Sequence, residues 1–144
     1  MRMSAHTLNI RIYYEDTDAG GIVYHSNFLN FAERARCELL RDVGYECSSI
    51  EEELGLLFVV KHADINYLKP AKLDDALQVK TTVESIRNTS FQMRQIVQKD
   101  GNNLCDMLVT LVCVETKNIK PVRFPDILRE KLDQFVDHTK YNKE

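Results

Sequence analysis

The chain has 144 residues, 44% of them hydrophobic and 28% charged, which fits one globular domain over residues 1–144 and excludes the disordered class. A net charge of −3 excludes general binding to nucleic acid, because no basic excess neutralises phosphates. No stretch approaches the ~20 apolar residues that span a membrane, and residues 1–16 lack the apolar run of a signal peptide. The sequence therefore predicts a cytoplasmic protein.

Cysteine usage predicts neither a metal site nor a redox site. The four cysteines are Cys37, Cys47, Cys105 and Cys113. None of them forms a C-x-x-C pair, so the common zinc and dithiol motifs are absent. Free thiols in a reducing cytosol are the simplest interpretation of all four.

The first predicted element is a half-buried strand over residues 6–14. Its apolar side chains alternate with polar ones and lie at Leu8, Ile10, Ile12 and Tyr14. Residues 15–26 break this alternation, and Gly20 and Gly21 permit backbone angles that other residues avoid. A loop is therefore expected after the strand.

A long helix is predicted next. Ser26 or Asn27 can cap its start, and Gly44 is a natural stop. Its apolar stripe has the spacing of one helical face and comprises Phe28, Phe31, Ala32, Ala35, Leu39 and Leu40. The helix is therefore expected to cover a sheet with this stripe.

The remainder of the chain predicts a short helix, four strands and a C-terminal helix. The short helix fits residues 48–55, with a capping box on Ser48 or Ser49. The strands are expected over residues 57–68, 76–86, 90–98 and 104–114. The last of them is apolar on both faces, as in a central strand or one buried at an interface. The final helix begins near Pro125 and carries Ile127, Leu128, Leu132, Phe135 and Val136. This order predicts an α+β fold with an antiparallel sheet.

The loop over residues 15–25 concentrates the groups that could carry chemistry. It holds Glu15, Asp16, Asp18, Tyr24 and His25 and leads directly into the long helix. A helix start presents unpaired N–H groups and a positive potential, which can stabilise an oxyanion. A nearby carboxylate can activate water or attack a carbonyl, and acyl transfer needs only these two parts. Taken singly, each acid is more often solvated, and a histidine there is more often a hydrogen-bonded surface residue.

The run YYEDTDAGGIVYHSNFLNFAERARCELLRD, residues 13–42, resembles the signature of the YbgC-like acyl-CoA thioesterases. These are relatives of 4-hydroxybenzoyl-CoA thioesterase and have the hotdog fold. The matching positions are Tyr14, Asp16, Thr17, Asp18, Gly21, Val23, Tyr24, His25, Phe31, Glu33, Ala35 and Arg36. Phe28 stands where the family commonly has Tyr. Residues 64–75 and 87–97 are similar to later parts of the family, so the resemblance spans most of residues 8–114.

The resemblance implies a hotdog fold, with a five-stranded antiparallel sheet wrapped around a long central helix. In such enzymes two protomers pair their sheets into one larger sheet, and dimers often pair again into tetramers. The active sites lie at the dimer interface. A homodimer or homotetramer is therefore expected, and the doubly apolar strand over residues 104–114 fits an interface or a central position.

The resemblance also implies roles for residues of the loop. Asp18 matches the catalytic carboxylate and would act as a nucleophile, through a transient anhydride, or as a general base for water. Backbone N–H groups near Val23, Tyr24 and His25 would polarise the thioester carbonyl. His25 would orient that carbonyl or the water, or else make structural hydrogen bonds, and these two interpretations stay level. Asp16 is expected to shape the loop.

Three other positions of the motif have less specific interpretations. Tyr14 is expected in the core or in a pocket wall rather than as an acid. Glu33 and Arg36 lie at helical spacing, so they form either a simple ion pair or part of the pocket floor.

The coenzyme A part of the substrate is expected along the hairpin near residues 87–90. By resemblance, pantetheine would contact Arg87, Asn88, Thr89 and Ser90. Candidates for its phosphates are Lys61, Arg87, Lys117 and Lys120. Tyr67, with Leu68 and Pro70, would close the acyl pocket, although such a turn also has a purely structural use. No cofactor is expected, because coenzyme A is part of the substrate.

The sequence thus favours a thioester hydrolase acting on an acyl-CoA. A close alternative keeps the chemistry and takes the acyl group from acyl carrier protein. A non-catalytic hotdog protein that binds acyl chains or bridges partners is a second alternative, which the presence of Asp18 disfavours. Dehydratases share the fold but use a different helix motif, so they rank third.

Overall fold

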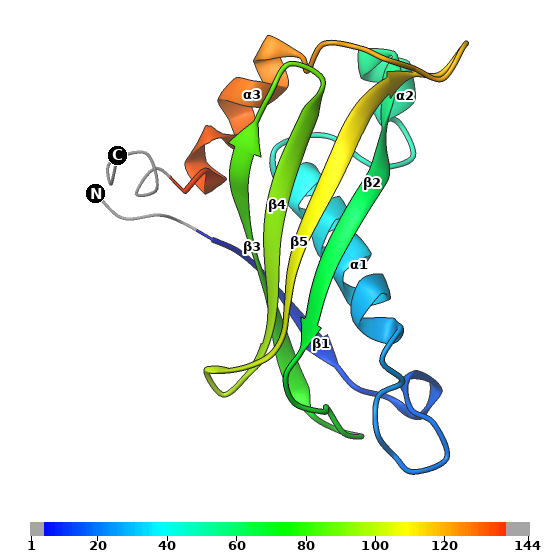
Figure 1. The fold of residues 1–144 in the computed structure, drawn as a ribbon, viewed down its shortest axis with the longest axis vertical. Helices are drawn as coiled ribbons and strands as arrows, with labels where there is room; N and C mark the ends of the chain where they lie inside the picture. Colours follow the sequence, from blue (N-terminus) through cyan, green and yellow to red (C-terminus); the bar gives the residue numbers. More distant parts are fainter. Residues whose placement is uncertain (1–4, 138–144) are drawn as a thin grey trace.

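The computed structural model describes residues 5–137 and contains one antiparallel sheet (Figure 1). Its strands are β1 (His6–Arg11), β2 (Leu56–Tyr67), β3 (Ala76–Ile86), β4 (Ser90–Lys99), β5 (Asn102–Glu115) and β6 (Lys120–Pro121). The order across the sheet is β1-β3-β4-β5-β2, and the two-residue β6 pairs with β5. The doubly apolar strand is therefore the interior strand β5, as its pattern predicted, and β2 lies at an edge.

Within the described residues, three α-helices accompany the sheet. They are α1 (Asn27–Asp42), α2 (Ile50–Leu54) and α3 (Asp126–Leu132), with short 3-10 turns at Tyr14–Asp16 and Asp133–Phe135. The longest, α1, packs against one face of the sheet and contacts β1 and β3 (Figure 1). The predicted α+β class is confirmed.

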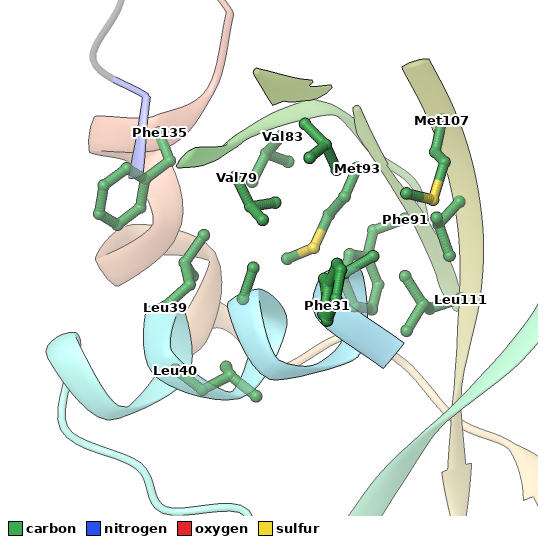
Figure 2. Packing of buried hydrophobic residues seen from close by; sticks show 14 of the residues in the cluster. Phe31, Leu39, Leu40, Val79, Val83, Phe91, Met93, Met107, Leu111 and Phe135 are labelled. Carbon is green, nitrogen blue, oxygen red and sulfur yellow. The ribbon is translucent and has the colours of Figure 1, made fainter. Parts of the chain in front are cut away.

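The apolar stripe of α1 forms one side of the core. All six stripe residues predicted from the sequence are buried. Figure 2 shows Phe31 and Leu39 of the helix on the side that faces Val79, Val83 and Met93 of the sheet. Burial of each large apolar side chain contributes about 1.5–3 kcal/mol to stability, so this interface fixes the helix on the sheet.

The polar side chain of Gln95, on β4, crosses this apolar interface. It is fully buried on the same face of the strand as Met93, where an apolar residue is expected. Its amide nitrogen donates to the Ala32 carbonyl at 2.9 Å and to the Thr81 hydroxyl at 3.1 Å. Its amide oxygen accepts a hydrogen bond from Arg36 Nη1 at 2.9 Å. Gln95 therefore links α1 to β3 and β4 at a defined position along the helix.

Two terminal predictions were wrong. Strand β1 ends at Arg11, not at residue 14, because the chain enters a 3-10 turn, and Tyr14 is consequently 81% exposed rather than part of the core. The C-terminal helix ends at Leu132, so Phe135 and Val136 lie in and after a 3-10 turn rather than on the helix. Ile127, at the start of the helix, is 53% exposed. In both places the strand or helix ends before the last apolar residue of its sequence pattern.

Glycines end α1 and α2, as the sequence predicted. The predicted side-chain caps at the N-termini of these helices do not form. Gly44 and Gly55 have φ of +107° and +72°, which suits a residue without a Cβ at each helix end. Neither α1 nor α2 has a side-chain hydrogen bond at its N-cap. Instead of forming a capping box, the Ser49 hydroxyl donates to Glu53 at 3.2 Å.

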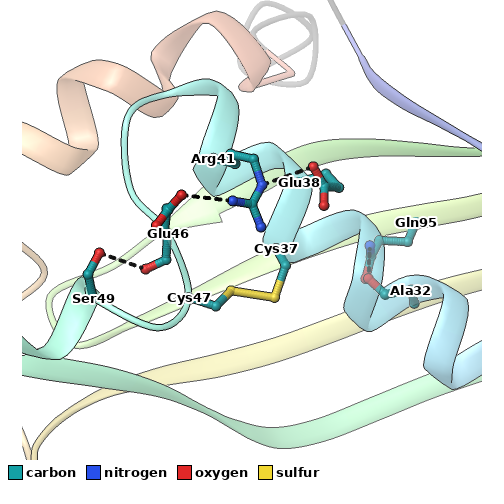
Figure 3. Close-up of a disulfide and its surroundings, with 8 residues drawn as sticks. All are labelled: Ala32, Cys37, Glu38, Arg41, Glu46, Cys47, Ser49 and Gln95. Atoms are coloured by element: carbon teal, nitrogen blue, oxygen red, sulfur yellow. Dashed lines mark hydrogen bonds and ion pairs between the residues drawn. A yellow bond between two sulfur atoms is a disulfide. The ribbon is translucent and has the colours of Figure 1, made fainter.

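The prediction of four free cysteines was wrong for one pair. Cys37 of α1 and Cys47 of the following loop form a disulfide (Figure 3). The turn at Gly44 folds the loop back on the helix and places the two Cα atoms 6.0 Å apart, within reach of a disulfide. The sequence spacing alone did not indicate this reversal. Cys105 and Cys113 are free and buried.

Replacement of Gln95 tests its role as the polar link between helix and sheet. Gln95→Leu removes the acceptor of a buried arginine bond and leaves the Thr81 hydroxyl unpaired, so we expect a loss of about 2–3 kcal/mol in the free energy of unfolding. Urea denaturation measures this loss. Gln92→Leu, a half-buried position on the opposite face of β4, is the control and should change stability by less than about 1 kcal/mol. Equal effects of the two substitutions would remove the special role of Gln95.

Candidate active site

Asp16 organises the loop between β1 and α1. Its side chain is buried, and its Oδ2 accepts a hydrogen bond from the Tyr13 N–H at 2.9 Å. Its carbonyl accepts from the Tyr24 N–H at 3.2 Å and from Asn27 Nδ2 at 2.8 Å. Asp16 thus ties the start of the loop to the start of α1, in agreement with the expectation that it shapes the loop.

Asp18 lies in a tight turn at the tip of this loop. The Asp18 N–H donates to the Ile22 carbonyl at 3.0 Å, and the Gly21 N–H donates to the Asp18 carbonyl at 3.1 Å. Gly21 has φ of +76°, which permits the turn. The Gly20 N–H donates to Asp18 Oδ1 at 2.9 Å, so one carboxylate oxygen is oriented while the side chain stays exposed to solvent.

The segment before β3 supports the loop from below. The Val23 N–H donates to the Ala71 carbonyl at 2.8 Å, and the Leu73 N–H donates to the Gly21 carbonyl at 3.1 Å. These bonds, with the bridge between Ile22 and Lys72, attach the turn that carries Asp18 to the sheet. The position of the carboxylate is therefore set by the sheet as well as by the loop.

Asp75 anchors that supporting segment. Its two carboxylate oxygens accept hydrogen bonds from Lys99 Nζ and from the Lys72 N–H, each at 2.8 Å. Burial alone raises the pKa of the Asp75 carboxyl, but these bonds and the lysine charges outweigh burial and hold that pKa below its ordinary 3.8. The charged form of Asp75 is therefore the one that the fold favours.

Aromatic side chains gather at the start of α1. The rings of Tyr24 and His25 lie 4.7 Å apart between centroids, and those of His25 and Tyr67 lie 5.7 Å apart, edge to face. Phe28 is 6.0 Å from Tyr67. Burial raises the pKa of the Tyr67 hydroxyl above its ordinary 10, and the neighbouring Cys105 acts in the same direction. The structure thus brings together three predicted site residues, Tyr24, His25 and Tyr67.

Two of the three predicted oxyanion donors are already engaged. The Val23 N–H donates to Ala71 and the Tyr24 N–H donates to Asp16, so neither amide is free to polarise a carbonyl. Within residues 5–137 no hydrogen bond is recorded for the His25 N–H, which lies at the start of α1. The hydrogen bonds that engage the Val23 and Tyr24 amides form only in the folded chain, so the sequence could not reveal them.

The predicted coenzyme A hairpin does not join this cluster within one chain. Residues 87–90 connect β3 to β4 at the end of the sheet near α3, whereas the loop with Asp18 lies at the other end (Figure 1). The 11-residue strand β3 separates the two ends by roughly 35 Å. The turn itself is packed by the C-terminal segment, since the Phe124 N–H donates to the Asn88 carbonyl at 2.7 Å and Arg129 Nη2 donates to the Arg87 carbonyl at 3.0 Å.

An apolar cavity of about 240 Å³ lies between α1, α2 and β2. Its walls include Leu40, Ile50, Phe58, Phe91, Met93 and Leu111, together with both cysteines of the disulfide. Glu33 and Arg36 also line it, which agrees with the pocket-floor alternative, and no ion pair within 4.0 Å joins them in the described chain. Burial lowers the pKa of Arg36, and the charge of Glu33 opposes this shift. Sequence reasoning missed this cavity, because its lining residues come from six separate elements, which are three helices and three strands.

Residues 5–137 contain neither a candidate metal site nor a candidate membrane-spanning helix. No group of three or more His, Cys, Asp and Glu side chains is arranged to hold a metal ion. None of the helices in this range has the length and apolar character needed to cross a membrane.

The curled antiparallel sheet with α1 on one face, and the acidic loop leading into that helix, define a thioesterase-like protein of the hotdog class. Residues 13–132 match the model of the thioesterase-like superfamily, and the chain belongs to this family. The predicted family resemblance, hotdog fold and thioester hydrolase class are therefore confirmed.

Individual relatives agree with this assignment. The acyl-CoA thioesterase YbgC of Haemophilus influenzae is 43% identical over 116 residues, which are 81% of this chain and 85% of that protein. The long-chain acyl-CoA thioesterase FadM of Escherichia coli is 31% identical over 79% of this chain and 86% of its own length. A solved structure described as a probable thioesterase from Bartonella henselae superimposes with a TM-score of 0.80 at 34% identity, over 85% of this chain and 100% of that one.

The Asp75 anchor predicts an acid-sensitive support of the site. Because its folded pKa is lowered, its contribution to stability is full above pH 3.8 and is lost as pH falls through the folded pKa. Asp75→Asn should therefore be less stable than wild type at neutral pH, and its stability should fall less steeply in acid. Urea unfolding from about pH 6 to about pH 3 measures both slopes. Asp74→Asn, an exposed neighbour with φ of +73° that asparagine tolerates, should keep the wild-type slope. Parallel slopes for Asp75→Asn and wild type would contradict this role.

Proposed function

We propose that this protein hydrolyses an acyl-CoA to the free acid and coenzyme A. The observation that carries the proposal is the Asp18 turn, in which a solvent-exposed carboxylate is oriented by the Gly20 N–H next to the start of a helix. The names of the relatives, an acyl-CoA thioesterase and a long-chain acyl-CoA thioesterase, support this substrate class.

Asp18 supplies the reactive carboxylate in this proposal. As a nucleophile it attacks the thioester carbon and expels the coenzyme A thiolate, and water then cleaves the resulting anhydride. As a general base it takes a proton from a water molecule that attacks the same carbon. Both routes consume one water and release one acid and one thiol. The hydrogen bond from Gly20 orients one carboxylate oxygen and leaves the other for either task.

The His25 N–H is the proposed oxyanion donor. It lies at the positive end of α1, and the two preceding amides are engaged by Ala71 and Asp16. A thioester carbonyl directed at this N–H would have its developing negative charge stabilised by the amide and by the helix dipole. The Tyr67 hydroxyl, which stays protonated, and the Tyr24 ring would form the wall around the His25 side chain.

A homodimer paired through β2 would complete the site. Strand β2 has 12 residues and one neighbour, β5, and it exposes Leu57, Val59 and Val60. A long apolar edge of this kind is a template for pairing with another strand. Antiparallel pairing of two β2 strands about their middle would set the Tyr67 end of one protomer beside the Leu57 end of the other. The loop with Asp18 would then approach the apolar cavity and residues 87–90 of the partner, which one chain holds apart.

The alternative carrier is acyl carrier protein. The chemistry at Asp18 would be the same, and only the groups that hold the phosphopantetheine would differ. The candidate cations Lys61, Arg87, Lys117 and Lys120 are all exposed, and they suit the phosphates of coenzyme A as well as an acidic carrier surface. A non-catalytic acyl-binding role would leave the orientation of Asp18 without a use.

Loss of the Asp18 charge should abolish turnover and leave the fold intact. Asp18→Asn keeps the side-chain volume in an exposed turn, so we expect thiol release from acyl-CoA to fall by at least about 10³-fold, with an unchanged circular dichroism spectrum. A panel of short, long and aromatic acyl-CoAs provides the assay. Glu15→Gln, another exposed acid of the same loop, is the matched control and should retain activity. Turnover by Asp18→Asn at the wild-type rate would remove Asp18 from the mechanism.

Pairing through β2 predicts the mass of the particle in solution. Light scattering at micromolar concentration should give a dimer or a tetramer for wild type. Val59→Lys places a charge on the exposed edge of β2 and should shift the protein toward monomer with at least about tenfold lower activity. Ile127→Lys, at an equally exposed apolar position on α3, should keep the wild-type mass. A fully active wild-type monomer would refute the shared site.

A further inference from the structure

The Cys37–Cys47 disulfide forms part of the wall of the apolar cavity. Both cysteines line the cavity, where they lie near Leu40 and Ile50. Cys47 is exposed to solvent and Cys37 is half-buried, so the bond lies at the boundary between the cavity wall and the surface. Figure 3 shows this bond between α1 and the following loop. A soluble reductant can therefore reach a covalent bond whose other side faces the cavity.

The first half of the loop that carries Cys47 does not need the disulfide. Val43 and Tyr45 are buried, and the Tyr45 N–H donates to the Leu40 carbonyl at 2.8 Å. Lys131 of α3 donates to the Val43 carbonyl at 3.2 Å and lies 5.0 Å from the Tyr45 ring centroid. Residues 43–45 thus remain fixed to α1 and α3 whether or not the disulfide is present.

The second half of the loop and α2 depend on the disulfide much more. The side chain of Glu46 contacts Arg41 at 3.1 Å, but both groups are largely exposed, and such pairs contribute little. Helix α2 has five residues, of which Ile50 is buried and Leu54 is partly buried against the core. The Ile50 side chain lines the cavity, so any outward movement of α2 enlarges the cavity directly.

We propose that Cys37 and Cys47 are a redox switch that sets the size of the acyl group this enzyme accepts. The inference rests on the proposed function, because it assigns the cavity to the acyl chain. With the disulfide closed, α2 is held over the cavity, and short acyl groups are preferred. With the disulfide open, residues 46–54 move outward, Ile50 leaves the wall, and longer chains enter.

The switch is operated by a dithiol of the thioredoxin or dithiothreitol type. One thiolate of the reductant attacks the exposed Cys47 sulfur, forms a mixed disulfide and releases Cys37 as a thiolate. The second thiol of the reductant then attacks the reductant sulfur that is bonded to Cys47, and Cys47 is released as a thiolate. Two electrons and two protons pass to the cysteine pair, and the reductant leaves as its disulfide.

The other cysteines cannot substitute for this pair. Cys105 and Cys113 are fully buried in β5, and burial raises the pKa of their thiols to about 11 and about 12. They are therefore almost entirely protonated near neutral pH and unreactive toward alkylating agents. After reduction, iodoacetamide should label Cys37 and Cys47 in the folded protein and leave the β5 pair unmodified.

The test compares chain-length preference in the two redox states of the whole protein. Intact mass first establishes which state is present. The ratio of kcat/KM for hexadecanoyl-CoA to that for butanoyl-CoA should rise on the order of tenfold when the disulfide of wild type is opened by dithiothreitol. The Cys37→Ser, Cys47→Ser double variant should show the higher ratio with or without reductant. An unchanged ratio in wild type, after mass and iodoacetamide labelling have established an open disulfide, would overturn the switch.

A second readout separates the switch from the proposed function. If wild type releases no thiol from any acyl-CoA in either state, the proposed function fails, and the apolar dye ANS then reports on the cavity. Dye fluorescence that rises several-fold on reduction of wild type, with unchanged circular dichroism and no response in the double variant, would still support the switch. Equal dye binding in both states would overturn it.

Discussion

The contact between α1 and the sheet is the constraint on which the other features depend. Six apolar side chains of the helix are buried against β1, β3 and β4, and Gln95 sets the position along the helix through its bonds to Ala32 and Arg36. Because Gln95 is fully buried, its bonds are strong enough to define a single register for an interface that apolar packing alone would leave free to slide. The start of α1 then carries the loop with Asp18, and its last turns carry the cavity wall with Cys37.

That arrangement separates the chemical groups from the apolar cavity along one helix and one set of strands. The turn with Asp18 is attached to the segment just before β3, whereas residues 87–90 follow the other end of that strand. One chain therefore cannot place residues 87–90 beside Asp18. The proposed pairing of two exposed β2 edges would bring opposite ends of two copies together. The same edge would be a liability for a monomer.

Support for the reactive loop comes from the sheet rather than from the loop itself. The hydrogen bonds from Val23 and Leu73 join the turn to the segment before β3, and Asp75 with Lys99 ties that segment to the end of β4. These bonds also engage the amides of Val23 and Tyr24, whereas the His25 N–H, the proposed oxyanion donor, makes no hydrogen bond within residues 5–137. The geometry of the site therefore follows from the hydrogen bonds that hold the loop to the segment before β3.

The sequence by itself determined the features that depend on local pattern. Period-two alternation placed β3 and β4 almost to the residue, helical spacing identified every buried residue of α1, and the Asp18 motif identified the family. Only the tertiary structure decided the strand order, the pairing of Cys37 with Cys47, the apolar cavity, the exposure of Tyr14 and the engagement of the Val23 and Tyr24 amides. Each of these joins residues far apart in sequence or depends on where a turn directs the chain. Side-chain periodicity carries no information about such contacts, because it reports which face of an element is buried and not what covers it.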